Sequence, residues 1–244
     1  MVFVPEEKLK RKMEMDGSVL KFMHSVGGAG KGILTMGGMI AVIGLMLAAA
    51  LAGTMGTESA VKVGAAMVLP GILLMVLGIS LHKKKLAGYL RTYEKATHLT
   101  QEQLAELEEE FKQPGTVLMA MDNAKDTNSL KKMGFITAHY VKFPGIDPSI
   151  FPLQEMVACF YTKRYLCQDG GYDRALIAYA SDGDLVYYYN SPPEKESLEV
   201  VSALEAHNPL IITDHHFTYE GKEYDAVRES DEVIALSRRM RSTE

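Results

Sequence analysis

The amino-acid sequence predicts an α+β protein in which a two-helix transmembrane hairpin is followed by an antiparallel-sheet domain with flanking helices. Three observations predict it. Two uncharged apolar runs stand close together, lysine and arginine gather outside them, and short β-branched and aromatic segments fill the second half. The chain divides into a basic juxtamembrane segment (1–31), the hairpin (32–81), a helical stalk (82–113) and the α+β domain (114–244).

The two apolar runs are long enough to cross a bilayer. The chain is 47% hydrophobic and 23% charged, an ordinary average that hides their presence. Residues 32–53 would form a helix of about 33 Å, and residues 63–81 just reach across a hydrocarbon core of about 30 Å. The intervening residues 54–62 suffice only for a tight turn. We therefore expect antiparallel helices, with both chain ends on the same side.

Basic residues predict which side that is. Ten lysines and arginines lie near the outer ends of the spans, among them Lys83, Lys84 and Lys85, whereas only Lys62 lies between the spans. Basic residues next to a span are retained in the cytoplasm. We expect a multi-pass protein of the cell membrane with both termini cytoplasmic. A cleaved secretory signal ending near residues 50–53 is disfavoured, because the apolar run is too long and a second span follows it.

Small residues repeat along both expected spans. They lie at Gly37, Ala41, Gly44 and Ala48 in the first and at Gly64, Gly71 and Gly78 in the second. A seven-residue repeat is nearly two helical turns, so each set forms a stripe, and small residues let membrane helices approach closely. The stripes predict helix packing, either within the hairpin or between chains. Pro70 should bend the second span. Neither span contains an ionisable group, which argues against a pump or transporter acting alone.

Helical segments are expected on both sides of the hairpin. Residues 6–23 place apolar residues on one face with lysines around it, as in a helix lying on anionic lipid. A short frayed helix is the alternative, because an Asp-Gly pair interrupts the pattern. Beyond the second span, Thr100 and Gln103 fit a capping box that begins an acidic helix. We expect its glutamate run, 108–110, to be exposed to solvent.

Strand patterns begin after residue 115. Five segments rich in β-branched and aromatic residues are bounded by turn residues, at 116–121, 134–143, 152–166, 174–180 and 184–189. Asp182-Gly183 between the last two segments is a hairpin signal, and the glycine pair before Asp173 is another. Four of the strands are therefore expected to form an antiparallel meander.

A helix and a tail follow the strands. Ser191 as N-cap, Pro192 at the first helical position and Glu194 predict a helix that ends before Pro209. One more short strand is expected at 209–213, and then a terminal helix. Its arginine-rich end is expected either to fray in solvent or to touch the membrane.

The order of the segments 134–143, 151–164 and 174–189 and of the helix after them resembles the bacterial PH-like domains that are attached to membrane helices. The resemblance covers residues 115–213. It implies a PH-like sheet domain without catalytic residues, and the strand count is low for a complete barrel. Thr137, Pro152, Leu153 and the pair Asp182-Gly183 match the family as fold markers.

One cluster has the ligand types of a metal site, since His215 and His216 follow Asp214. Adjacent residues on a strand point to opposite faces, so the two histidines are not expected to share an ion. Cys159 and His139 are types that could pair as nucleophile and base, but only neighbouring strands bring them near each other. We expect no metal site and no catalytic residue.

Three further patterns have structural explanations. The glycine-rich stretch 27–32 lacks the preceding strand of a phosphate-binding loop. Alternation along a strand buries at least one ring of 187–189. Cys159 and Cys167 match no zinc spacing and are expected as reduced thiols in the cytoplasm. No cofactor is expected.

Charge limits the partners. From Thr97 to Glu244 there are 14 lysines and arginines against 25 acidic residues, a net charge of −11. Nucleic acid requires the opposite sign. The expected partners are the lipid bilayer and another protein or a second copy. The sequence predicts a membrane-anchored interaction or regulatory module that is not an enzyme. The alternative is an accessory subunit of a membrane transport or export complex that packs through its glycine-striped helices.

Overall fold

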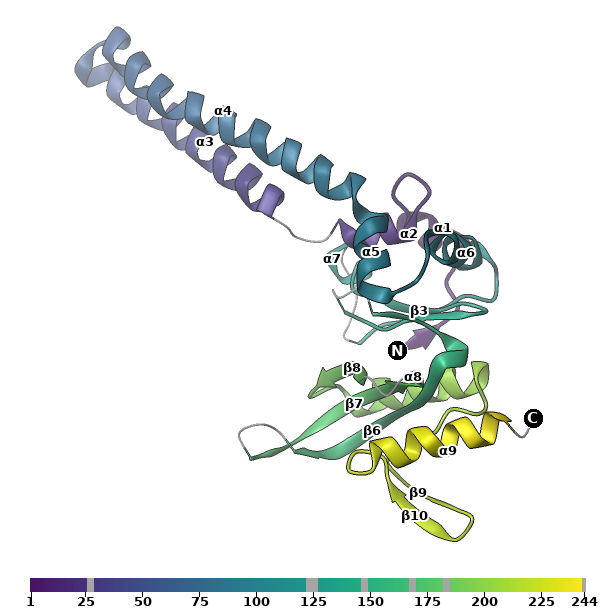
Figure 1. Cartoon of the computed structure of the whole chain (residues 1–244). Coiled ribbons are helices and arrows are strands. Elements are labelled where there is room, and N and C mark those ends of the chain that lie inside the picture. The colour runs from purple at the N-terminus through teal and green to yellow at the C-terminus, as the bar shows by residue number, and fades with distance from the viewer. Residues whose placement is uncertain (26–28, 122–126, 146–148, 167–169, 182–184, 243–244) are drawn as a thin grey trace. The chain divides into compact units, whose positions relative to one another are not determined.

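The computed structural model describes residues 1–25, 29–121, 127–145, 149–166, 170–181 and 185–242. Within these ranges the chain forms two compact units (Figure 1). The hairpin unit is His24–Tyr89. The sheet unit joins Met1–Met23 to Leu90–Glu244. The protein is α+β, as the sequence predicts, and its two long apolar helices belong to one unit while its sheets belong to the other.

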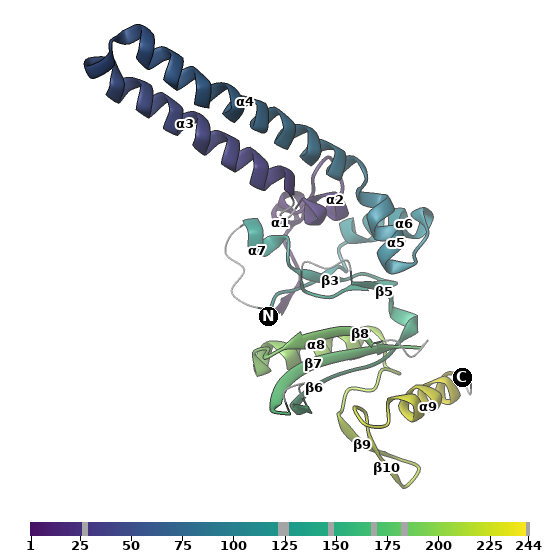
Figure 2. The same cartoon turned by 60° about the vertical axis from the view of Figure 1, so that its left-hand side comes forward.

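The hairpin unit consists of α3 (Ala29–Met55) and α4 (Thr57–Ala87), which lie side by side and antiparallel (Figures 1 and 2). Both helices are long and apolar enough to cross a membrane. Gly56 joins them with a φ of 79°, in the left-handed region that favours glycine.

The expected turn at residues 54–62 is wrong, because most of it is helical. α4 begins at Thr57, and the Glu58 carboxylate accepts an ion-pair hydrogen bond from Lys62 Nζ at 2.6 Å. A glutamate four residues before a lysine supports a helix, and an acidic residue in the first turn complements the helix dipole. α4 also continues through Pro70 and through the lysine run 83–85.

The sheet unit contains three antiparallel sheets among the described residues, with strand orders β1-β2-β3-β4-β5, β6-β7-β8 and β10-β9 (Figure 2). The strands are β1 (Val2–Phe3), β2 (Val117–Met119), β3 (Gly134–Ile136), β4 (Tyr140–Lys142), β5 (Ile150–Pro152), β6 (Met156–Leu166), β7 (Tyr172–Ala180), β8 (Leu185–Asn190), β9 (His216–Tyr219) and β10 (Lys222–Asp225). The helices are α1 (Glu7–Lys12), α2 (Val19–His24), α5 (Tyr89–Thr97), α6 (Gln101–Lys112), α7 (Thr127–Leu130), the 3₁₀ turn η1 (Leu153–Glu155), α8 (Glu194–His207) and α9 (Ser230–Ser242). The expected four-stranded meander is wrong in its strand count, because only β6–β8 form it and segment 134–143 belongs to the five-stranded sheet. The Asp182-Gly183 pair lies outside the described residues.

A hydrophobic core lies between the five-stranded sheet and one face of β6–β8. Ile136 and Phe143 come from the first sheet, and Cys159 and Leu176 come from the second. The apolar face of α8 completes this core, where Leu204 is fully buried. The helix begins at Glu194 with Pro193 at its N-cap, so the expected Ser191 cap is wrong. Ser191 instead donates its hydroxyl hydrogen to Asp173 on β7.

A second core covers the other face of β6 and β7. Phe160 and Ile177 point into it because neighbouring strand residues alternate between faces. Val233 and Leu236 of α9, three residues apart on one face of the helix, close it. Figures 1 and 2 show α9 and the β9–β10 hairpin on this side of the sheet. The strand expected at 209–213 is reduced to one parallel bridge, between Ile212 and Ala158.

The basic end of α9 is attached to the sheet unit, and the expectation of a frayed end is wrong. The Arg238 side chain donates to the Ser181 carbonyl, at 3.0 Å from Nε. Arg241 donates to the carbonyls of Gln154 and Met156. Ser181 follows β7, Gln154 lies in η1 and Met156 begins β6, so the arginines attach α9 to this end of the β6–β7 pair.

The first 23 residues belong to the sheet unit. Val2 pairs with Met119, which adds β1 to the edge of β2. Met13, Leu20 and Met23 are buried, so the apolar face expected to lie on lipid is inside the protein. Burying this face removes it from water without a membrane, and the expected interfacial helix is wrong.

Helix α6 begins with a side-chain cap and carries two half-buried carboxylates, Glu108 and Glu110. Thr100 and Gln103 form the predicted capping box, in which each side chain accepts from the other residue's backbone N–H. The expectation of a solvent-exposed glutamate run is wrong for two members. Glu108 accepts from the Ser18 hydroxyl, and Glu110 bonds a turn of the sheet. Only Glu109 fits the expectation, with an exposed ion pair to Lys112.

That turn divides the expected strand 134–143 into β3 and β4. The chain reverses over 137–139, and Ile136 then pairs with Val141. Glu110 accepts from the Thr137 hydroxyl at 2.7 Å and from the His139 backbone N–H at 3.0 Å, and it also pairs with the His139 ring. Burial would raise the pKa of Glu110, but these bonds outweigh it and hold the pKa below its ordinary value.

We predict that Glu110→Gln destabilises the sheet unit by about 1–3 kcal/mol, because donors of the turn lose a charged acceptor. A carboxylate with a lowered pKa stabilises the fold above the ordinary glutamate pKa, and this contribution is lost as the pH falls through the lowered value. Chemical unfolding of the full chain in detergent, followed by tyrosine circular dichroism, should therefore show a weaker acid dependence in the variant. Glu109→Gln is the control and should shift stability by less than about 0.5 kcal/mol. Equal effects of the two substitutions would contradict the role of Glu110.

Candidate functional site

The small-residue stripes of α3 and α4 face each other within the hairpin unit. A Cβ placed on Gly71 would lie 2.8 Å from both the Ala41 nitrogen and the Gly37 oxygen. One placed on Gly64 would lie 2.6 Å from the Ala48 Cβ. Such separations are too short for a side chain, so the backbones touch where the sequence has glycine.

The remaining stripe residues continue this contact. Gly44 lies against Met67 and Val68, and Gly78 lies against Gly30 and Leu34. The stripe predicted from the sequence did not include Gly30, although this glycine lies seven residues before Gly37. We call the contact formed by Gly30, Gly37, Ala41, Gly44, Ala48, Gly64, Gly71 and Gly78 the glycine seam.

The outer surface of the hairpin unit is apolar. Large side chains such as Leu45 and Leu73 are exposed, Leu73 to 70%. A Cβ placed on Gly38 would meet no neighbouring atom within 4 Å, so this glycine lies away from the glycine seam. A helix pair with small residues inside and large apolar residues outside is suited to hydrocarbon, because apolar solvent offers no reason to bury the large ones.

The lysine run 83–85 ends α4 and does not follow it. Lys84 and Lys85 lie in the last helical turn, where positive charge complements the carbonyl end of the helix dipole. Lys83 and Lys84 are exposed. A lysine side chain can reach several ångströms along the helix axis, so these groups extend beyond the apolar stretch.

A polar cluster in the sheet unit consists of His215, His216 and Asp225; we call it the His–Asp cluster. His216 begins β9 and pairs across the hairpin with Asp225, the last residue of β10. His215 precedes the strand. The two imidazole centroids are 4.0 Å apart with the rings inclined by 28°, so the expectation that these rings point to opposite faces is wrong. Strand alternation does not apply, because only one of the two residues is in the strand.

Hydrogen bonds fix the buried half of the His–Asp cluster. His215 Nε2 lies 3.1 Å from Asp225 Oδ1, and His215 Nδ1 lies 2.9 Å from the hydroxyl oxygen of Thr162 on β6. The ring of Phe160 stacks on His215 with centroids 5.6 Å apart. An ionised carboxylate can only accept, so Nε2 carries the ring hydrogen and Nδ1 accepts from Thr162.

The electrostatics of the cluster favour a neutral imidazole beside an ionised carboxylate. Burial, and then the neighbouring His216, lower the pKa of His215 despite the attraction of Asp225. Burial would raise the pKa of Asp225, but hydrogen bonds from the backbone N–H groups of Arg228 and Val227 and from His215 outweigh it, and the pKa is lowered. Neutral imidazole and ionised carboxylate are the forms that bind metals.

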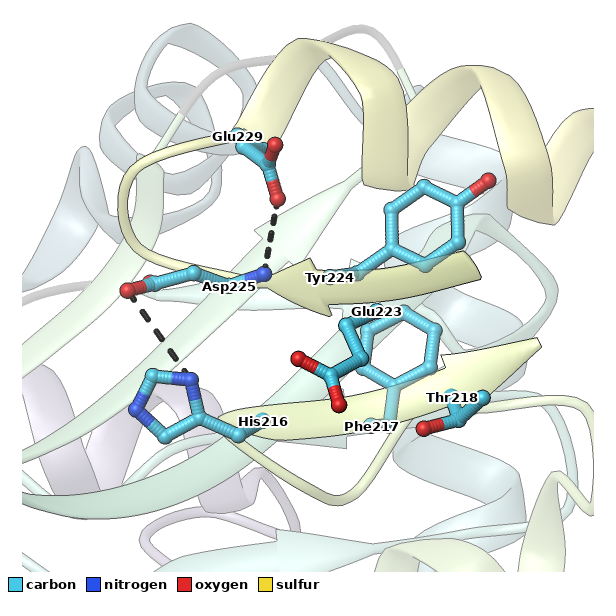
Figure 3. A pocket seen from close by; sticks show the side chains of 7 residues that line it. All are labelled: His216, Phe217, Thr218, Glu223, Tyr224, Asp225 and Glu229. Carbon is cyan, nitrogen blue, oxygen red and sulfur yellow. Dashed lines mark hydrogen bonds and ion pairs between the residues drawn. The ribbon is translucent and has the colours of Figure 1, made fainter. Parts of the chain in front are cut away.

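Two hollows border the His–Asp cluster. A groove of about 740 Å³ is lined by Lys163, Arg164, Leu166, Tyr172, His215, His216, Asp225, Val227 and Arg228. The second hollow, of about 410 Å³, lies over the β9–β10 hairpin (Figure 3). Figure 3 shows His216 and Asp225 pointing toward each other and the Glu229 carboxylate accepting from the Asp225 backbone N–H, a bond of 2.9 Å.

The other sequence candidates are not brought together. Cys159 is fully buried in the core and burial raises the pKa of its thiol, whereas His139 is exposed and pairs with Glu110. A second group of possible ligands consists of Glu106, Glu110 and His139. Glu110 already bonds the β3–β4 turn, and Glu106 accepts from the Tyr140 hydroxyl. Tyr187 is buried on Phe143, as alternation predicts for one ring of the three.

The remaining markers have structural positions. Thr137 bonds the β3–β4 turn, and Pro152 and Leu153 end β5 and begin η1. Gly30 and Gly32 lie in α3, while residues 26–28 and Cys167 lie outside the described residues. No family model, curated protein or solved structure matches the chain.

We predict that Gly71→Leu weakens the hairpin unit by about 1–3 kcal/mol, because the new side chain would overlap the α3 backbone. Gly38→Leu is the matched control, since the same substitution there meets open space. Titration of the full chain from mild detergent into dodecyl sulfate, followed by helical circular dichroism, measures the difference. Unfolding of both variants at the same dodecyl sulfate fraction would contradict the glycine seam.

Proposed function

We propose that the chain is a membrane-anchored interaction or regulatory module of a bacterial cell and has no catalytic activity. In this proposal α3 and α4 cross the cell membrane as a hairpin, and the sheet unit lies in the cytoplasm with both termini. The membrane anchor is supported by how side chains are distributed in the hairpin unit. Its small residues contact one another between the helices, and its large apolar residues face outward.

The orientation rests on charge. The lysines at the end of α4 and the basic residues before α3 outnumber the single lysine between the helices, and basic residues remain on the cytoplasmic side. The first 23 residues and residues 90–244 form one unit, which requires both ends of the hairpin to be on the same side. This agrees with the antiparallel arrangement of the two helices.

The PH-like character of the sheet unit is part of the proposal. Two consecutive antiparallel meanders, β2–β5 and β6–β8, are followed by α8, whose apolar face packs into the core between them. This order of strands and helix is the feature on which the resemblance rests. The fold markers Thr137, Pro152 and Leu153 lie at a turn and a strand end of the first meander.

Two observations support an interaction role over the alternatives. The Thr162–His215–Asp225 chain has the order of a catalytic triad, but Thr162 is buried, so its hydroxyl is not accessible to a substrate. The accessory-subunit alternative requires the stripes to pack on a foreign helix. The glycine seam uses them within the hairpin, which favours the first function.

We predict that a single cysteine at position 58, in a chain whose native cysteines are replaced by serine, reacts with a membrane-impermeant maleimide added to intact cells. A single cysteine at position 220, on the β9–β10 turn, should react only after the membrane is opened. The reason is that Glu58 lies at the far end of the hairpin, whereas Glu220 belongs to the sheet unit. Labelling of position 220 from outside, or recovery of the chain in the soluble fraction, would contradict the proposed topology.

We predict that a photo-crosslinking amino acid at Leu198 or Tyr172, exposed apolar residues of the sheet unit, traps a partner protein in cells. The same group at Leu73, on the outer face of α4, should trap no foreign protein. A partner trapped from Leu73 alone would favour the accessory-subunit alternative. Turnover of a substrate by the purified full chain would overturn the non-catalytic role.

A further inference from the structure

We propose that His215, His216 and Asp225 bind one divalent transition-metal ion of the zinc type. Each residue offers one ligand atom, and the three atoms lie within 4.8 Å of one another. Two imidazole nitrogens and a carboxylate oxygen are usual zinc ligands, and a site with three protein ligands leaves a fourth position for water or another group. The site lies within the sheet unit and does not depend on membrane insertion.

The geometry requires one side chain to move. Ligand atoms around a tetrahedral zinc ion stand roughly 3.4 Å apart, given bonds of about 2.0–2.1 Å. His216 lies farther from Asp225 than His215 does, since its Nδ1 is 3.9 Å from Oδ2, against 3.1 Å between His215 Nε2 and Oδ1. Its side chain is 67% exposed, whereas His215 and Asp225 are only 14% and 19% exposed. The exposed His216 side chain can therefore turn toward His215 and Asp225, which the fold already holds together.

The groups behind the ligands are those of a metal site. Asp225 Oδ1 accepts from two backbone N–H groups, at 3.0 Å each, and Oδ2 remains on the side of His216. Thr162 holds the far nitrogen of His215, as outer groups do for metal-bound histidines. When the ion binds Nε2, the ring hydrogen moves to Nδ1 and is donated to the Thr162 oxygen, so the imidazole stays neutral.

One charge competes with the ion. Arg228 Nε lies 3.7 Å from Asp225 Oδ2, and its side chain is 79% exposed. An exposed arginine can turn into solvent at small cost, so the ion would displace it from the carboxylate. Lys163 also lines the groove but pairs with Glu194 at 2.7 Å. The groove gives an ion a path from solvent to the ligands.

The ligand set also selects the kind of ion. Mg²⁺ and Ca²⁺ take oxygen ligands, and two of the three atoms here are nitrogen. Binding would join the residue before β9 to the end of β10, and through Thr162 to β6. The ion is therefore expected to stabilise the β9–β10 hairpin against the sheet.

The test is equilibrium dialysis of the full chain in detergent, without a histidine tag and with Cys167→Ser, against Zn²⁺ at pH 7.5. One zinc ion per chain, measured by elemental analysis, and a rise in unfolding temperature with Zn²⁺ are expected. Mg²⁺ and Ca²⁺ should produce neither. Co²⁺ in place of Zn²⁺ should give the visible absorption of a four-coordinate site.

Four variants test the ligands and the groups around them. His216→Ala, which removes an exposed side chain, and Asp225→Asn should each weaken zinc binding at least tenfold. Thr162→Val should weaken it about 10- to 100-fold, the range for a group that orients a ligand. Arg228→Gln should strengthen it, because the competing charge is gone; a site elsewhere in the chain would not respond in this way.

Two control variants separate this site from other histidines. His207→Ala removes an exposed histidine of α8, and His139→Ala removes the histidine beside Glu106 and Glu110. Both should bind zinc as the parent chain does. The proposal is overturned if the parent chain binds well below one ion, if His216→Ala and Asp225→Asn bind as it does, or if His139→Ala abolishes binding.

Discussion

Close contact between two helix backbones is the constraint on which the architecture depends. The backbones of α3 and α4 touch at glycine after glycine, and no other residue type fits at the glycine positions of the seam. This contact holds the helices as an antiparallel pair, so the end of α4 lies beside the start of α3. Only then can Met1–Met23 and Leu90–Glu244 form one unit, although the whole hairpin unit separates them in sequence.

Carboxylates that bond groups of other elements organise the sheet unit. Glu110 of α6 fixes the β3–β4 turn, and Asp225 of β10 fixes His215 and through it Thr162 on β6. In both cases hydrogen bonds outweigh burial and lower the pKa of the acid. The two groups differ in what surrounds them. Both oxygens of Glu110 bond groups of the β3–β4 turn. In Asp225, by contrast, Oδ2 faces the exposed His216, and the residue lines a groove.

Local patterns predicted the elements whose causes are local. The two long helices, the Thr100–Gln103 capping box and the buried face of α9 all follow from periodicity or capping chemistry within a few residues. The α+β class followed as well. The seven-residue spacing also identified the residues that meet in the glycine seam, apart from Gly30 at the start of α3.

Features with distant causes could not be predicted. The turn at 137–139 has no glycine, proline or asparagine, and its stabilising carboxylate lies 27 residues earlier in α6. The rings of His215 and His216 lie close together because β9 begins at His216 and not before it. The sequence pattern does not fix the first residue of a strand. Asp225 was absent from the sequence candidates because only hairpin register brings it opposite His216.

The pairing of Val2 with Met119 bears on the order of synthesis. The first strand leaves the ribosome long before its partner, and both long helices are translated in the interval. Its edge therefore remains unpaired while α3 and α4 are translated, and non-local pairing of this kind slows folding. The five-stranded sheet can thus be completed only after translation has passed the hairpin, and the edge of the newborn amino-terminal strand remains exposed until then.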